Sequence, residues 1–506
     1  DREKEMSIRN SQKRQKVCHL LQQLESVRRN VRSLFNSGTE SVMSYKFNKS
    51  RVRLLKDKNS VKKRCKGILY WMIRDIRVQD NWALLFAQRA ALKNGLPLHI
   101  CFCVPPNYLH STMRHYKFLI KGLMEVEDEC TKLNINFHLL RGEPDTTVLD
   151  FVREYDMGAV VADFSPLRLS TSWVHNLAKN LPKQVPMCQV DAHNIVPCWY
   201  ASPKQEYAAR SFRKKVLPML STFLTEFPPV IHHVCSSDQE FTKNDWTDIW
   251  NHVDVDKSVD EIAWAKPGYR AAVKELESFL NERLERYAAG RNNPVLNCTS
   301  NLSPWFHFGM ISVQRCVLEV NHYRNQYVEA VSSFNEEAII RRELSDNYCF
   351  YNNKYDSMDG ASAWAIATLI AHSNDKRAYT YTLREMENAE THDDLWNACQ
   401  QQLIGHGKMH GYLRMYWAKK FLEYTKTPQE ALDWALYLND RYSIDGNDPN
   451  GYVGCMWSIC GLHDQGWGER NVFGKIRYMN YEGCKRKFNV NEFIAKWKKS
   501  VVENES

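Results

Sequence analysis

Residues 67–73 read GILYWMI and residues 158–164 read GAVVADF, two short and almost uninterrupted apolar runs. Three further runs of the same kind accompany them: LPLHICFCV at 96–104, INFHLL at 135–140 and VPMCQVD at 185–191. Amphipathic stretches with helical periodicity separate these runs, notably 81–93, 113–133 and the segment after Pro144. Apolar strands that alternate with helices are typical of a mainly parallel sheet with both faces covered. The pattern predicts a doubly wound α/β domain at 67–196.

Doubly wound sheets bind ligands at the carboxyl ends of their strands. No G-x-G-x-x-G motif follows the first apolar run, so the sequence does not predict a standard dinucleotide site there. We expect a different ligand, or none, in this domain.

The strand pattern stops near Asp191. Residues 197–260 contain a Pro-rich FPPVIHH and long polar stretches, which indicate a connection with one helix at 207–225. From Pro267 onward the periodicity is helical, with N-terminal caps such as Ser303-Pro304. The chain is therefore predicted to carry an all-α domain at 261–498, followed by a tail at 499–506.

Composition indicates an ordinary globular protein, with 506 residues of which 43% are hydrophobic and 25% charged. No apolar run approaches the roughly 18 residues that cross a bilayer, so we expect no membrane association. The 15 cysteines have no regular spacing and no secretory segment is visible. Reduced thiols in an intracellular compartment are the better interpretation.

The net charge of +9 is unevenly distributed. Residues 1–66 hold 19 Lys and Arg against 6 Asp and Glu, a surplus of 13, so the remaining 440 residues carry a net charge of −4. We expect this basic arm to be largely disordered. Its VKKRCK at 61–66 is either an import signal, a non-specific phosphate contact or a solvated charge run. The nucleus is the expected compartment, with the mitochondrion as the alternative.

Two histidines, His406 and His410, have the spacing that places both imidazoles on one helical face. The glutamate of a zinc-protease HExxH motif is missing, so no metal site is predicted. The flanking Gly405, Gly407 and Gly411 favour close approach of the backbone to another group.

The segment TSNLSPW at 299–305 places three hydroxyls and an amide immediately before a predicted helix. A helix N-terminus with such groups can bind phosphate, although an ordinary N-cap has the same appearance. Farther along, Arg414 and Asp445 present opposite charges among apolar and aromatic neighbours. Charges in such surroundings are rarely buried unless they are paired.

Trp417 and Tyr424 lie seven residues apart, so on a helix they share a face, and Trp396 lies one predicted helix earlier. A row of such rings can carry an electron, but rings at this spacing also fill ordinary hydrophobic cores. The spacing alone leaves both interpretations open.

Five separated motifs in the same order resemble the class II cyclobutane pyrimidine dimer photolyases, within the photolyase and cryptochrome superfamily. They are WMIRDIRVQDNWALLFAQ at 71–88, SNLSPWFHFGMIS at 300–312, RREL at 341–344, GHGKMHGYLRMYWAKK at 405–420 and NDRYSIDGNDPNGYVG at 439–454. The resemblance runs from about residue 67 to residue 487. It implies an α/β domain followed by a helical domain that holds FAD, reduced in the active form.

The resemblance also implies roles for individual residues. The cofactor-binding residues would be Tyr287, Thr299, Ser300, Ser303, Arg414, Asn439, Asp445, Asn447 and Gly451. Thr299, Ser300 and Ser303 would hold the phosphates, and Asn439 would face flavin N5. Arg414 and Asp445 would form an ion pair beside the ring, because an anionic reduced flavin requires a nearby cation.

For the substrate, the resemblance implies UV-damaged DNA, double- or single-stranded, with the dimer flipped into a pocket above the flavin. Glu337 would contact the dimer and stabilise its radical anion. Arg341, Met415 and Trp457 would line the same pocket. We expect the protein to act as a monomer.

The aromatic row would reduce oxidised flavin, with Trp417 nearest the cofactor and Trp396 next. Tyr424 departs from the family pattern, in which we expect Trp. Tyrosine is hard to oxidise unless it loses its proton, so the outer end of the row is in doubt. Gln465 also stands where we expect Arg.

Two other matters stay open at the level of sequence. A cryptochrome-like blue-light photoreceptor would use the same FAD and aromatic row and is the alternative function. A second, antenna chromophore, deazaflavin or folate, is compatible with the α/β domain, but no motif identifies it.

Overall fold

The computed structural model describes residues 43–56 and 60–498. The predictions for residues 1–42 of the basic arm and for the tail at 499–506 fall outside these residues.

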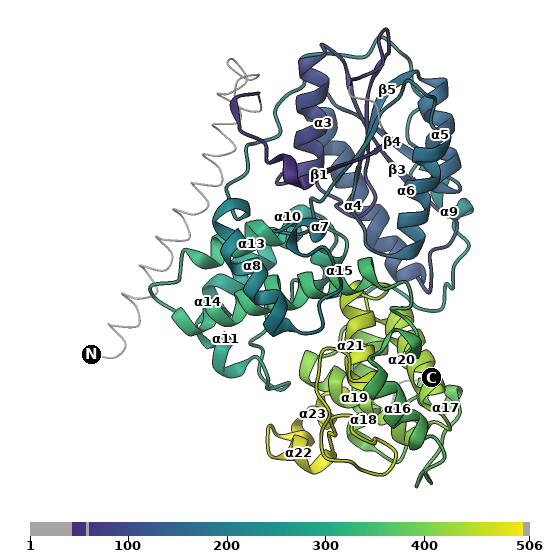
Figure 1. Ribbon diagram of the computed structural model, residues 1–506, viewed down its shortest axis with the longest axis vertical. Helices are drawn as coiled ribbons and strands as arrows, with labels where there is room; N and C mark the ends of the chain where they lie inside the picture. The colour runs from purple at the N-terminus through teal and green to yellow at the C-terminus, as the bar shows by residue number, and fades with distance from the viewer. Residues whose placement is uncertain (1–42, 57–59, 499–506) are drawn as a thin grey trace, which may run out of the picture.

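The α/β domain is built on a six-stranded sheet with the strand order β1-β6-β5-β2-β3-β4 (Figure 1). Its parallel strands are β2 (Gly67–Trp71), β3 (Leu98–Val104), β4 (Asn136–Arg141), β5 (Met157–Asp163) and β6 (Met187–Val190). Each overlaps one of the five apolar runs, and β2, β3 and β5 are buried along their whole length. Burial on both faces explains why these strands show no polar alternation.

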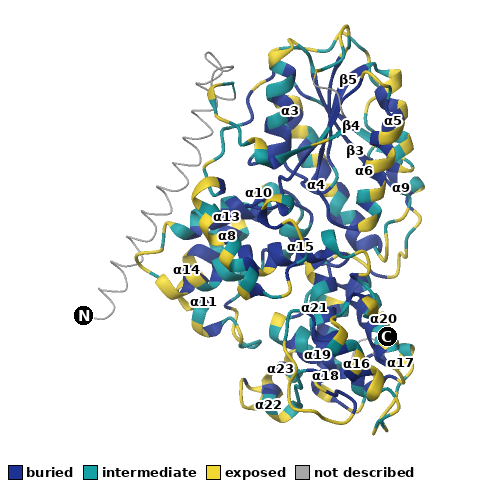
Figure 2. Ribbon diagram, viewed as in Figure 1, coloured by how far each residue is buried: buried dark blue, intermediate teal, exposed yellow. Residues whose placement is uncertain are grey.

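Helices cover both faces of the sheet. Alternate residues of β2, such as Ile68 and Tyr70, pack with α3 (Trp82–Lys93) and α4 (Met113–Lys132). The intervening Leu69 and Trp71 pack with α5 (Pro144–Glu154) and α6 (Arg168–Asn180). Figure 2 shows the strands in the colour of buried residues between helices whose outer faces are exposed. The predicted doubly wound, mainly parallel fold is confirmed.

Within the described residues 43–56 and 60–66, the structure corrects the prediction of a largely disordered arm. Residues Lys49–Arg51 form a short 3-10 helix, η2, and Val52–Lys56 form β1, which pairs antiparallel with β6 at the sheet edge. Arg51 is buried and donates to the carbonyl oxygens of Ile195 and Phe223 at 2.8 and 3.0 Å. The many Lys and Arg residues of this segment led to the wrong prediction, because an edge strand can carry charged side chains.

The charge run VKKRCK is also part of the fold. The backbone amides of Lys62 and Lys66 donate to the carbonyls of Gly158 and Asp156, at 3.0 Å each. The Lys62 and Lys66 side chains form ion pairs with Asp156 and Asp238. The run is therefore tied to the start of β5.

Residues 197–260 contain α8 (Ala209–Phe223), within the range expected for one helix, and two short helices, α7 (Cys198–Ala201) and α9 (Ile249–His252). Beyond them, the described chain is helical. The helices are α10 (Tyr269–Ser278), η3 (Phe279–Arg283), α11 (Leu284–Gly290), α12 (Ser303–His307), α13 (Val313–Asn321), α14 (Val328–Asn335), η4 (Glu336–Arg341), α15 (Arg342–Tyr351), η5 (Met358–Gly360), α16 (Ala363–Ala371), α17 (Leu383–Glu387), α18 (Asp394–His406), α19 (Gly411–Tyr424), α20 (Pro428–Tyr442), α21 (Pro449–Cys460), α22 (Tyr481–Lys485) and α23 (Val490–Trp497).

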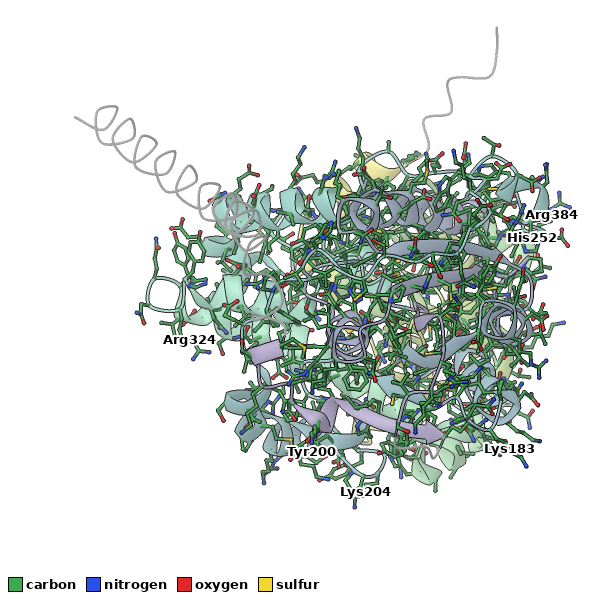
Figure 3. The ribbon with its side chains drawn as sticks, turned by 90° about the horizontal axis from the view of Figure 1, so that it is seen from above. Lys183, Tyr200, Lys204, His252, Arg324 and Arg384 are labelled. Carbon is green, nitrogen blue, oxygen red and sulfur yellow. The ribbon has the colours of Figure 1, made fainter. Side chains whose placement is uncertain are left out.

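These helices form two groups below the sheet in Figure 1, with α10 to α14 on the left and α16 to α23 at the bottom of the view. Helices α10 to α14 share one apolar core with the α3 and α4 face of the sheet. Helices α16 to α23 enclose a separate core. Seen from above, side chains fill the space between the ribbons, and the labelled Lys183, Lys204 and Arg324 lie at the rim (Figure 3).

A buried ion pair joins the two domains. Arg74, which follows β2, donates to both carboxylate oxygens of Asp346 on α15, at 2.6 and 3.0 Å. Asn194, which follows β6, donates to the same carboxylate at 2.9 Å. The RREL motif lies one turn before Asp346, and its Glu343 accepts from the amide of Ile195 at 2.6 Å. These contacts fix the strand ends against the helices.

No helix within residues 43–56 and 60–498 combines the length and apolar character needed to cross a membrane.

Candidate functional site

Arg414 and Asp445 form the ion pair expected from the sequence. Arg414 lies on α19 and Asp445 in the turn between α20 and α21, with 3.3 Å between Arg414 Nη2 and Asp445 Oδ1. Ser443 lies between them, accepting from Arg414 at 3.1 Å and donating to Asp445 at 2.5 Å. Burial raises the pKa of Asp445, but the Arg414 charge and the Ser443 hydrogen bond outweigh it and lower this pKa to about 2. The pair is therefore ionised and fixed at neutral pH.

The cluster carries more positive charge than Asp445 neutralises. Half-buried Lys408 is a second cation near Asp445 and donates to Asn301 at 3.0 Å. Burial lowers the pKa of Lys408 to about 8, and the nearby Arg414 charge acts in the same direction. The buried Nε of Arg414 finds no hydrogen-bond partner among the described residues. An unpaired donor beside an excess of cations indicates a site for an anionic ligand.

The predicted phosphate segment lies beside this cluster. Thr299 donates to Asn301 at 3.0 Å, and Asn301 is the residue that also accepts from Lys408. Asn301 has a φ of +59°, the left-handed conformation that Asn tolerates better than most residues. Half-buried Ser300 precedes it, and Ser303 begins α12 close enough to Asp445 to contribute to its lowered pKa. Hydroxyls and cations thus converge, as a bound diphosphate requires.

Asn439 and Gly451 are in contact. A Cβ on Gly451 would lie 2.8 Å from Asn439 Nδ2, so only glycine leaves room for that amide. Asn439 is buried and donates to Asp440 at 2.9 Å. Asn447 is turned elsewhere, because its side chain contacts the backbone of His110 and the hydroxyl of Ser111 in the α/β domain. The structure does not place the Asn447 side chain with Arg414 and Asp445.

Tyr287 and Glu337 are linked through Arg291. Arg291 Nη2 lies 2.8 Å from Glu337 Oε1, and its guanidinium lies 5.8 Å from the centre of the Tyr287 ring. Glu337 occupies η4, a π-helical turn, and such turns are frequent at functional sites. Arg341, at the end of η4, is exposed and pairs with Glu336 at 3.2 Å.

Met415 and Trp457 lie on two helices that pack together, α19 and α21. Lys419, one turn after Met415, has its Nζ 4.5 Å from the centre of the Trp457 ring and donates to the Ser458 carbonyl at 2.9 Å. Burial lowers the pKa of Lys419 to about 7. Gln465, where the resemblance leads us to expect Arg, is exposed.

The three aromatic residues form a continuous buried row. The Trp417 and Trp396 rings are stacked, with centres 6.2 Å apart and planes 9° from parallel. Tyr424 meets Trp396 edge-on at 6.1 Å. The order is therefore Trp417, Trp396, Tyr424, with the residue from the other helix in the middle. Tyr424 is only 1% exposed, so it is not the exposed end of the row.

The HGKMH segment is not a single helix. Helix α18 ends at His406, Gly407 adopts a left-handed φ of +66°, and His410 caps α19. The two imidazoles therefore do not share a helical face. Close approach occurs at Gly407, where a Cβ would lie 2.6 Å from Ile262, but Gly405 and Gly411 face open space. Within the described ranges, no group of three or more His, Cys, Asp or Glu could hold a metal ion.

A pocket lies at the carboxyl ends of β2 and β3, where the α/β domain meets the helical domain. It holds about 880 Å³ of space, part of which is open to solvent. Apolar and aromatic side chains dominate its lining, and Arg74, His115, His307 and Asp448 are among its charged or ionisable groups. Doubly wound sheets bind ligands at this edge.

Sequence reasoning missed Lys408 and Arg291, and it noted Asn301 only as the amide of the 299–305 segment. Lys408 stands in a Gly-rich motif, whereas Arg291 lies outside the quoted motifs. The sequence offered one indication of this role, because Lys408 stands between two glycines and between two histidines. Its meaning depends on contacts with Asn301, which lies 107 residues earlier.

A doubly wound sheet joined to an all-α domain with this cation cluster and aromatic row defines the photolyase and cryptochrome class of flavoproteins. Residues 68–231 match the DNA photolyase family. The chain is 56% identical to the deoxyribodipyrimidine photo-lyase of Potorous tridactylus, covering 90% of this chain and 86% of that protein. It is 45% identical to the Arabidopsis thaliana photo-lyase, covering 86% and 89%. The chain belongs to the DNA photolyase family, as its class II motifs indicated.

A solved structure shows the same fold at low identity. The archaeal photolyase from Sulfolobus tokodaii, described with two FAD molecules, superposes with a TM-score of 0.65 at 16% identity. The match covers 86% of this chain and 90% of that one.

Proposed function

We propose that this protein repairs UV-damaged DNA by the light-driven splitting of cyclobutane pyrimidine dimers. The observation that carries the proposal is the Arg414, Asp445 and Lys408 cluster with its unpaired Arg414 Nε, in a chain 56% identical to a deoxyribodipyrimidine photo-lyase. The cluster fits an anionic redox cofactor, and the family supplies its identity, FAD. When bound in its reduced form, FAD supplies an electron that light makes available to the dimer.

The residues of the cluster bind and orient this cofactor. Thr299, Ser303 and Lys408 converge on the position suited to its diphosphate. The fixed Arg414 and Asp445 pair sets a dipole beside the ring, and Lys408 adds the net positive charge that favours an anionic flavin. Gly451 has no side chain and so leaves room for the Asn439 amide, which we place in the same region.

Glu337 is the proposed contact to the dimer. It is partly exposed, with 41% of its side chain accessible, and it is held by Arg291. A carboxyl group that donates a hydrogen bond to the dimer stabilises the negative charge that develops there. Met415 and Trp457 supply apolar walls for the flipped bases. Arg341 is exposed and suited to a backbone phosphate.

The pocket at the strand ends is the proposed site of a second chromophore. Its aromatic lining suits a planar ring. A deazaflavin or a folate fits this description, and the absorption spectrum of the purified protein separates them.

The remaining proposals concern partners and compartment. We propose binding to dimers in both double- and single-stranded DNA, by a monomer, in the nucleus or the mitochondrion. Titration with DNA tests the binding, and gel filtration tests the monomeric state. Fluorescent fusions with and without residues 1–42 test the compartment.

The decisive experiment uses an oligonucleotide with one thymine dimer, the reduced protein and blue light. We expect dimers to disappear in the light and to persist in the dark. Flavin binding and photoreduction without any repair would instead favour a cryptochrome-like photoreceptor.

The variant Glu337→Gln tests the proposed dimer contact. We expect a lower repair yield with unchanged flavin content. Glu336→Gln is the matched control, because Glu336 occupies the same π-helical turn but pairs with Arg213 and Arg341. An equal yield in both variants would remove Glu337 from the dimer site.

A further inference from the structure

The outer member of the aromatic row is a buried tyrosine with a carboxylate as its partner. Tyr424 Oη donates to Asp393 Oδ2 at 3.0 Å, and both residues are almost fully buried, at 1% and 7% exposure. Burial and the Asp393 charge hold the pKa of Tyr424 far above its usual value. The phenol is therefore protonated at rest and already hydrogen-bonded to a base.

Asp393 is held rigidly in this position. Its Oδ1 caps α18 by accepting from the Trp396 amide at 2.9 Å, while Oδ2 also accepts from the Tyr416 hydroxyl. Lys420 Nζ lies 3.9 Å from Oδ2. The Asp393 carboxylate thus accepts hydrogen bonds from the backbone amide of Trp396 and from the hydroxyl of Tyr424, two neighbouring members of the row.

A tyrosine differs from a tryptophan in the proton that it must lose on oxidation. A tryptophan radical cation can persist with its proton, whereas a phenol radical cation is so acidic that oxidation is practical only when a base accepts the proton at once. A buried site excludes water from that role, so the protein must supply the base.

We propose that Asp393 is the proton acceptor that allows Tyr424 to serve as the terminal electron donor of the row. The proposal rests on the proposed function only in requiring a photoexcited oxidised flavin beside Trp417.

The electrons and protons balance within the named groups. Trp417 loses one electron to the photoexcited flavin, Trp396 refills Trp417, and Tyr424 refills Trp396. The Tyr424 O–H bond breaks as its electron leaves, and the proton passes along the 3.0 Å hydrogen bond to Asp393. The products are a neutral Tyr424 radical, a protonated Asp393 and a flavin reduced by one electron.

The test is Asp393→Asn in the flavin-loaded protein. Asn retains an oxygen that can cap α18, so the helix start is preserved, but it cannot accept a proton at neutral pH. We expect photoreduction to slow by about a hundredfold, the size of a typical general-base effect. The electron paramagnetic resonance signal of a tyrosyl radical and the slowing of photoreduction in heavy water should both disappear.

Two further variants separate proton transfer from structural damage. Tyr424→Trp combined with Asp393→Asn should restore photoreduction, without a tyrosyl signal, because tryptophan does not need the base. Tyr416→Phe removes the other hydroxyl on Asp393 Oδ2 and should retain the tyrosyl signal and the heavy-water effect, because the proton acceptor is still present.

The proposal is overturned if Asp393→Asn photoreduces at the normal rate with the normal heavy-water effect. It is also overturned if Tyr424→Trp fails to rescue the Asp393→Asn variant while flavin remains bound. Repair by chemically reduced protein is scored in parallel. Loss of that repair in the unmodified protein would instead contradict the proposed function.

Discussion

Two clusters of buried charge illustrate the difference between a structural contact and a binding site. At the domain joint, Arg74 and Asp346 are 8% and 0% exposed, and the guanidinium meets both carboxylate oxygens. In the helical domain, Arg414 and Asp445 are 21% and 12% exposed and share a single contact of 3.3 Å. The first pair is complete, whereas the second leaves Arg414 Nε without a partner among the described residues.

The difference teaches that a site can be located by hydrogen bonds that are missing as well as by residues that are present. A buried donor without an acceptor costs free energy, and at Arg414 the surrounding excess of positive charge indicates that an anionic ligand supplies the acceptor. The joint pair should therefore determine stability, and the Arg414 pair should determine ligand affinity.

The largest expected effect follows from breaking the complete pair. Asp346→Ala leaves the Arg74 charge buried and uncompensated, which costs about 3–5 kcal/mol. Denaturant unfolding followed by tryptophan fluorescence measures the loss. A loss of less than about 1 kcal/mol in the free energy of unfolding would show that the Arg74 and Asp346 pair does not determine stability.

The next effect concerns the incomplete pair. Arg414→Leu should weaken FAD binding by roughly 10- to 150-fold, since a hydrogen bond to a charged group is worth about 1.5–3 kcal/mol. The flavin-free protein should also lose some stability, because Asp445 stays buried without the Arg414 charge that lowers its pKa, but the loss should be smaller than for Asp346→Ala. Titration with FAD, followed by flavin fluorescence, measures the affinity.

Arg441→Leu is the matched control for Arg414→Leu. Arg441 lies in the same domain and is paired with Asp256 and Glu387, away from the cluster. Equal losses of FAD affinity in the two variants would contradict the assignment of Arg414.

A smaller and pH-dependent effect is expected from Lys408. Its pKa of about 8 means that Lys408 is charged below pH 8 and loses its proton above it. FAD affinity should therefore fall as the pH rises above about 8. A bound diphosphate would favour the charged lysine and so move this fall in affinity to a higher pH. Lys408→Met should bind more weakly and lack the fall, whereas Lys408→Arg should retain tight binding at high pH.

Stability should follow the opposite trend from affinity. Between pH 8 and the ordinary lysine pKa of about 10.5, the unfolded chain binds the Lys408 proton and the folded chain does not. The flavin-free protein should gain stability over that interval, and Lys408→Met should lack this gain. A matching loss of stability would mean that burial does not lower this pKa.

The smallest expected effect tests how far the cofactor site extends along α18. Gly405 lies within α18, and a Cβ there would meet nothing within 4 Å. Gly405→Ala should stabilise the protein by about 0.5–1 kcal/mol and leave FAD affinity unchanged. A loss of affinity would place the cofactor against this residue.

Local pattern was sufficient for the sheet and for the family. Five apolar runs predicted β2 to β6, because strands buried on both faces are apolar at every position. Strand β1 was missed, because an edge strand carries charges and its pairing with β6 is not local. The motifs identified Arg414 and Asp445 as partners, because few arrangements can bury two charges.

Contacts between distant segments decided the rest. The sequence determined which residue types were available, including the aromatic row, the hydroxyls of 299–305 and the unusual Tyr424. Only the tertiary structure placed Lys408 on Asn301, turned Asn447 toward the α/β domain and set Asp393 against the Tyr424 hydroxyl. Hydrogen bonds depend on distances of a few tenths of an ångström between side chains from different helices, and no spacing along the chain encodes those distances.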